Sequence, residues 1–126
     1  MAQEPVPTAV LAVAAAAGGA LLGWVGARVL FVGSGFSLIP WSIVVLALGA
    51  GCRSRRGAVG VGGIFGFALA FSFMAAGYDG AAPLGTRLFP FVVLGSFGSV
   101  CGVALAMAGL VLRAAVSRGA GASRPE

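Results

Sequence analysis

The sequence Cys52-Arg53-Ser54-Arg55-Arg56-Gly57 separates two long apolar runs and carries three of the chain's eight cationic side chains. The runs on either side resemble membrane-spanning helices, which need about 20 predominantly apolar residues. Arginine-rich connections between such helices stay on the cytoplasmic side of a membrane. This hinge, residues 52–57, therefore predicts the direction in which the other segments cross the bilayer.

The composition is typical of a membrane protein. Of the 126 residues, 60% are hydrophobic and 9% are charged, and the mean hydropathy is +1.07. Soluble domains are about 45–50% apolar and about 25% charged. A soluble chain with this composition could not cover its surface with polar groups, so we expect a single domain that has the lipid bilayer as its partner.

The net charge of +5 comes entirely from arginine, because the chain has neither lysine nor histidine. The arginines lie at the ends of apolar runs and form no basic face with interleaved aromatic residues, which argues against a nucleic-acid partner. Arginine without lysine, together with abundant alanine and glycine, indicates a high-GC genome. The expected location is a bacterial inner membrane.

Four apolar runs predict four helices, at residues 8–31, 36–52, 57–78 and 88–112. Their short connections predict an all-α membrane protein with four transmembrane helices in an up-down-up-down antiparallel bundle. Residues 1–7 form a short N-terminus, and residues 113–126 form an arginine-containing tail that we expect to be partly disordered. Both of these end segments are predicted to be cytoplasmic.

The first run has a second interpretation, as a signal peptide, because Ala14–Ala17 resemble the small residues of a cleavage site. A signal peptide begins with a positively charged region, whereas Glu4 is the only charge before this run. The run is also long for the apolar part of a signal peptide. A retained transmembrane helix is therefore favoured.

The distribution of arginine predicts the orientation. The hinge and the tail lie at the same end of the bundle and together hold six arginines, of which Arg53, Arg55 and Arg56 determine the topology. The opposite end holds only Arg28 and Arg87. The positive-inside rule then places both termini in the cytoplasm. Aromatic residues typical of a membrane interface fall toward the outer helix ends: Trp24, Trp41 and Tyr78.

Small residues recur at every fourth position along three of the runs, so they share one face of each helix. Helix association in lipid relies on close backbone approach at such faces. The three ladders are Ala15, Gly19, Gly23 and Ala27; Ala58, Gly62, Gly66 and Ala70; and Gly98, Gly102 and Ala106. We expect their glycines to be the helix-packing residues.

The residues of common catalytic and transport sites are missing. A serine or cysteine nucleophile would have no histidine or lysine as its base, and metal sites built from histidine or paired cysteines cannot form. Proton-coupled transporters place an ionisable residue inside the membrane, whereas the carboxylates here lie outside the apolar runs. We expect no enzyme activity, no catalytic residues, no metal and no cofactor.

The two cysteines, Cys52 and Cys101, do not predict a disulfide framework. The three arginines beside Cys52 would favour a reactive thiolate. A small residue tolerated at the membrane interface is the simpler interpretation.

One candidate polar site lies at the outer rim, where four residues are expected to converge: Arg28, Tyr78, Asp79 and Arg87. Arg28 can extend to the lipid headgroups, and Asp79 can pair with Arg87 across their loop; both interpretations are structural. The functional interpretation is an entry point for an anion or another substrate.

These observations favour a small multi-pass membrane protein that is a non-enzymatic, helix-packing subunit or accessory. Its expected partner is a second copy or a larger membrane protein. The alternative is a small homo-oligomeric channel or carrier for a neutral or anionic solute.

Overall fold

The computed structural model describes residues 7–29 and 38–122, and this part of the chain is almost entirely helical. Residues 1–6 of the predicted N-terminal segment, the end of the first predicted helix, the start of the second and residues 123–126 of the tail lie outside the described residues. The elements are α1 (Thr8–Val29), α2 (Leu38–Gly51), α3 (Arg55–Ala76), the short 3-10 helix η2 (Leu84–Arg87) and α4 (Leu88–Ala122). The predicted all-α class is confirmed.

Three of the helices, α1, α3 and α4, are long and apolar enough to span a membrane. Helix α2 is apolar but has only 14 residues, which at about 1.5 Å per residue gives roughly 21 Å. The hydrocarbon core of a bilayer is about 30 Å thick. The described part of the second predicted span is therefore shorter than the bilayer core.

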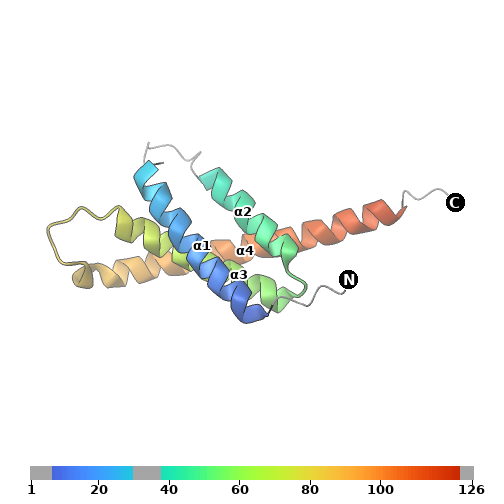
Figure 1. Cartoon of the computed structure of the whole chain (residues 1–126), viewed down its shortest axis with the longest axis horizontal. Helices are drawn as coiled ribbons and strands as arrows, with labels where there is room; N and C mark the ends of the chain where they lie inside the picture. The colour runs from blue at the N-terminus through green and yellow to red at the C-terminus, as the bar shows by residue number, and fades with distance from the viewer. Residues whose placement is uncertain (1–6, 30–37, 123–126) are drawn as a thin grey trace.

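The helices form two crossed layers (Figure 1). Helices α3 and α4 run antiparallel along the long axis of the molecule, and α1 packs across α3 while α2 packs mainly on α4. Successive helices run in alternating directions. As a result, the hinge and the C-terminal half of α4 lie at one end of the bundle. The C-terminal ends of α1 and α3 lie at the other, which we call the Arg28 end.

Helix α3 begins two residues before its predicted start, inside the hinge. Ser54 has extended backbone angles, and its Oγ accepts a hydrogen bond of 3.1 Å from the Gly57 N–H. A serine in this position satisfies one of the free N–H groups at a helix start, so the helix can begin directly after it. Arg55 and Arg56 therefore occupy the first turn of α3, and the connection is shorter than the predicted one.

Helix α4 continues ten residues beyond its predicted end, and the tail that we expected to be partly disordered is helical as far as Ala122. No proline interrupts residues 113–122, and much of this segment is alanine, the best helix former. Arg113 Nη1 also donates a 2.9 Å hydrogen bond to the Ala50 carbonyl at the end of α2, where helix carbonyls lack partners. In Figure 1 this part of α4 projects past the other helices.

The core is small and made mostly of small side chains. Phe65 is the largest fully buried side chain, and its buried neighbours include Ala15, Ala58 and Ala106. Many of the large apolar side chains point outward; Phe89 and Phe97, for example, are 80% and 69% exposed. Outward-facing phenylalanine is costly in water and normal against lipid tails, so the exposed surface agrees with a membrane environment.

Candidate functional site

The first ladder packs α1 against α3. A Cβ on Gly19 would lie 2.6 Å from the carbonyl oxygen of Phe65, and a Cβ on Gly23 would lie 2.5 Å from that of Leu69. Real Cβ atoms do not approach a carbonyl so closely, and these carbonyls belong to the helix backbone, which cannot turn aside. The two helices can therefore reach this separation only with glycine at both positions.

The second and third ladders face one another across α3 and α4. A Cβ on Gly62 would lie 2.5 Å from the Gly102 carbonyl oxygen, and a Cβ on Gly98 would lie 2.5 Å from that of Gly66. A Cβ on Gly66 or Gly102 would overlap the opposite backbone outright. All six of the predicted packing glycines thus lie in contacts within one chain.

A further close contact, between α2 and α4, was missed from the sequence. A Cβ on Gly49 would overlap the backbone of Ala106, and a Cβ on Gly109 would overlap the Leu46 carbonyl. Gly109 follows Ala106 by three residues, whereas the ladders were recognised by a spacing of four. Spacings of three also place residues on one helix face, and including them would have extended the third ladder to Gly109.

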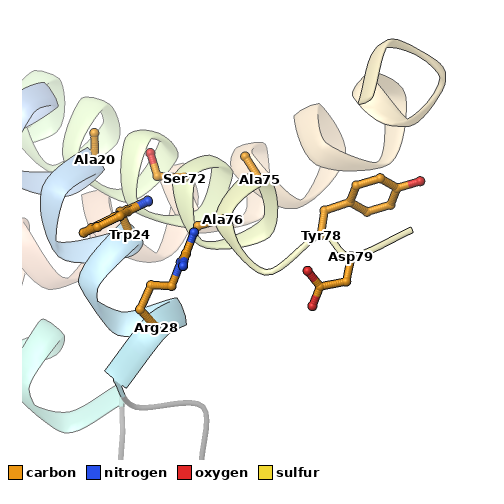
Figure 2. A pocket seen from close by; sticks show the side chains of 8 residues that line it. All are labelled: Ala20, Trp24, Arg28, Ser72, Ala75, Ala76, Tyr78 and Asp79. Atoms are coloured by element: carbon orange, nitrogen blue, oxygen red, sulfur yellow. The ribbon is translucent and has the colours of Figure 1, made fainter. Parts of the chain in front are cut away.

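Three of the four predicted rim residues line one cavity of about 580 Å³ at the Arg28 end (Figure 2). Arg28 comes from the last turn of α1, while Tyr78 and Asp79 follow the end of α3. The rest of the lining is Ala20, Trp24, Ser72, Ala75 and Ala76. An adjoining cavity of about 260 Å³ is also lined by Arg28 and Asp79.

Arg87 lies apart from these cavities. It ends η2, is exposed, and lines neither the larger nor the smaller cavity. Asp79 instead faces the space beside Arg28 (Figure 2). The loop pair between Asp79 and Arg87 therefore stays a prediction, and the charges that share the cavity are Arg28 and Asp79.

The contacts of Arg28 and Tyr78 determine the geometry of this site. The Arg28 guanidinium lies over the Trp24 ring, 5.4 Å from its centroid, a distance at which the ring attracts a cation. The Tyr78 hydroxyl donates a 3.1 Å hydrogen bond to the Ala82 carbonyl, and its ring packs edge-on against Phe91 at 5.9 Å. Tyr78 thus forms one contact within the loop after α3 and one with α4. Together these contacts keep Asp79 beside the cavity.

Cys52 is not the thiolate that its neighbouring arginines suggested. The residue is buried, and its Sγ donates a 3.3 Å hydrogen bond to the Leu48 carbonyl. Burial raises the pKa of the Cys52 thiol, because the charged form loses solvation. A neutral, hydrogen-bonded thiol is a poor nucleophile at neutral pH.

We expect Cys52 in the Cys101→Ser variant to react with a water-soluble maleimide at least about tenfold more slowly at pH 7 than the same cysteine in the unfolded chain. The raised pKa has a consequence for stability as well. The folded state favours the protonated thiol, so the contribution of Cys52 to folding stability is fully present below the ordinary cysteine pKa. It is lost as the pH rises through the raised pKa. Mass spectrometry of the labelled protein measures the rate, and equal rates in both states would contradict the burial.

Within the described residues, no three His, Cys, Asp or Glu side chains come together as a metal site would require. The fold and the cavity together define an all-helical protein with three helices able to cross a membrane and a charged pocket at one end of its bundle. No family model, curated protein or solved structure matches this chain. Proposals on function therefore depend on the geometry of this chain alone.

Proposed function

We propose that the chain is a four-span protein of a bacterial inner membrane, with both termini in the cytoplasm. Its proposed role is that of a non-enzymatic, helix-packing subunit that associates with a second copy or with a larger membrane protein. The alternating helix directions and the arginines of the hinge support this topology. A helix as short as α2 can cross a locally thinned bilayer, with flanking side chains such as Arg53 extending to the headgroups.

The topology has a direct test in reporter fusions. A four-span chain places fusions before Thr8 and after Ala122 on the same side, so both should give cytoplasmic green fluorescence and no periplasmic phosphatase activity. A fusion at Gly85, between α3 and α4, should give the reverse result. If α2 turned back without crossing, the two termini would report opposite sides and the four-span proposal would be rejected.

The observation that carries the packing role is an apolar groove of about 560 Å³ between α2 and the α3–α4 pair. It is lined by apolar side chains such as Trp41, Val45 and Leu105, and Cys101 opens onto it from an exposed position. Three of the ladder glycines, Gly66, Gly98 and Gly102, line part of this groove, which is open at the surface. Helices associate in lipid through close packing of such surfaces, so a neighbouring helix can occupy this groove.

A second copy of the chain is the occupant that we propose. Phe97 lies on the rim of the groove and is 69% exposed, so a bulky apolar side chain stands directly beside a recess. Two copies related by a twofold axis can each insert Phe97 into the groove of the other, because an isologous contact places the same patch on both sides. Cys101, one turn along α4, would then face its counterpart.

Cross-linking in native membranes tests this proposal. In a Cys52→Ser background, a short bismaleimide should join two chains through Cys101. The matched control carries its only cysteine at Val13, which is 68% exposed on α1 and lies away from the groove, and it should remain monomeric. Equal cross-linking of both variants would indicate random collision, and a Cys101 adduct with a larger protein would name a different partner.

The alternative is a homo-oligomeric channel or carrier, and the cation at the larger cavity is the observation in its favour. Arg28, together with the exposed Arg87, would attract anions to the mouth of a pore formed between copies. Anion flux into vesicles that contain the purified protein should then fall in Arg28→Gln and Arg87→Gln. Flux that is independent of both arginines, or no flux at all, removes this alternative.

A further inference from the structure

The larger cavity at the Arg28 end combines two opposite charges with a recess of small side chains. Arg28 approaches the cavity from α1, and Asp79 approaches it from the loop after α3, so the two charges belong to different elements (Figure 2). The Trp24 ring under the guanidinium favours one position for the Arg28 side chain. A ligand placed between the two side chains would meet a fixed cation on one side and a carboxylate on the other.

The cavity extends along the helices away from its charged mouth. Its lining includes Ala20, eight residues before Arg28 on α1, which corresponds to about 12 Å along the helix axis. Ala75 and Ala76 form part of the opposite wall on α3. Because alanine leaves room that larger side chains would fill, a shallow recess remains beside the close α1–α3 contact. This shape fits an amphiphile with a polar head and an apolar stem.

We propose that this cavity binds the headgroup of a zwitterionic aminophospholipid, with the phosphate on Arg28 and the primary ammonium on Asp79. A guanidinium matches a phosphate with two parallel hydrogen bonds. A primary ammonium has three N–H donors for a carboxylate, whereas a trimethylammonium group has none. A headgroup that carries only a negative charge would pair with Arg28. It would offer no cation to the Asp79 carboxylate.

Tyr78 is a positioning residue for this site. Its hydrogen bond to Ala82 and its contact with Phe91 hold the loop that carries Asp79. Gly80 allows the loop to fold around the Tyr78 ring, because a Cβ at this position would lie 2.5 Å from the hydroxyl oxygen. These contacts attach the loop that carries Asp79 to α4 and so limit how far the carboxylate can move from the cavity.

This inference rests on the proposed membrane topology, because the Arg28 end must lie at a membrane interface. A soluble aminoalkyl phosphate shares the same headgroup chemistry. The recess beside the charged mouth, lined by Ala20, Ala75 and Ala76 together with Trp24 and Ser72, favours the lipid, since a soluble ligand would leave this part unfilled.

The test is lipid retention by the full-length protein, purified in mild detergent with equimolar phosphatidylethanolamine, phosphatidylglycerol and phosphatidylcholine and measured by native mass spectrometry. Wild-type protein should retain the ethanolamine lipid about tenfold over the other two. Arg28→Gln should lose most of this retention. Asp79→Asn should remove the preference for ethanolamine over choline, because the neutral amide does not attract the ammonium.

The matched control is Arg87→Gln, which removes an arginine at the same end of the bundle but outside the cavity; it should retain lipid as wild type does. Excess soluble phosphoethanolamine should displace little of the lipid, and full displacement would identify the soluble compound as the ligand. Equal retention of all three lipids by wild type, or unchanged selectivity in both cavity variants, would overturn the proposal. The protein could be recovered from the membrane fraction and cross-link through Cys101 but show no lipid preference. That result would refute the headgroup site and leave the proposed function in place.

Discussion

Gly66→Leu is expected to separate α3 from α4 and to give the largest loss of stability among single substitutions in the chain. A Cβ on Gly66 would overlap the Gly98 carbonyl and lie 3.2 Å from the Gly102 Cα. These are backbone atoms of a regular helix, so the clash can be relieved only by moving one helix away from the other. Moving the helices apart also loses the neighbouring contact between Gly62 and Gly102.

Inserting extra methylenes into a well-packed site costs about 1–3 kcal/mol and occasionally more. For a leucine placed against backbone we expect a loss of about 3 kcal/mol or more. The matched control is Gly60→Leu on the same helix, where a Cβ would meet nothing within 4 Å. Because leucine is a better helix former than glycine by up to about 1 kcal/mol, this control should be neutral or stabilising.

Unfolding in mixed micelles of mild and denaturing detergent, followed by far-ultraviolet circular dichroism, measures both variants. A Gly66→Leu protein as stable as Gly60→Leu would contradict the close α3–α4 contact. The experiment also separates folding from association. Since Gly62 and Gly66 pack inside the chain, a loss of oligomer in their variants would follow from a damaged fold and would not locate an interface between copies.

Gly49→Leu is expected to detach α2 from α4 while leaving the α3–α4 pair in place. A Cβ on Gly49 would overlap the Ala106 backbone, whereas one on Gly51, two residues later, would meet nothing within 4 Å. We expect Gly49→Leu to lose about 2–3 kcal/mol and Gly51→Leu to lose nothing.

Cys52 reports this change locally, because it follows α2 directly and is buried in the folded chain. Detachment of α2 should expose its thiol, so maleimide labelling of Cys52 should become at least about tenfold faster in Gly49→Leu than in Gly51→Leu. Fast labelling in Gly51→Leu would mean that the end of α2 opens for another reason. Unchanged labelling in Gly49→Leu would contradict the α2–α4 contact.

The sequence predicts the α3–α4 pair better than it predicts the position of α2. Small residues at every fourth position along one helix identify a face, and the Gly62 and Gly98 ladders supply such faces on two consecutive helices. Helix α2 has no ladder of its own. Its contact with α4 pairs Gly49 with Ala106 and Leu46 with Gly109, and only the Gly109 side follows from a residue spacing in the sequence.

The ends of the helices show a similar limit. Arginines in the hinge indicated a connection, but a serine cap can start a helix within a charged stretch, and Ser54 does so. The tail was expected to be partly disordered because it is a chain end, yet its alanines and the hydrogen bond from Arg113 to Ala50 continue α4 to Ala122. Charge alone therefore does not determine where a helix begins or ends.

The candidate site could be anticipated in part. Arg28, Tyr78 and Asp79 lie at the ends of two helices that an antiparallel bundle brings to the same side, so their common cavity follows from topology. The exclusion of Arg87 depends on η2, a short turn that the sequence did not predict. The shallow recess beside the charges depends on how closely α1 approaches α3, which only the three-dimensional structure provides.

The most direct test of the packing role is native mass spectrometry of the full-length chain, extracted in mild detergent from the membrane of its own host. The proposal predicts a defined dimer, and its Phe97→Ala variant should shift toward monomer because the side chain beside the groove is lost. Co-purification with a larger membrane protein would retain the subunit role but replace the second copy as the partner. A monomer without any partner, in several mild detergents and in cross-linked native membranes, would contradict the proposal.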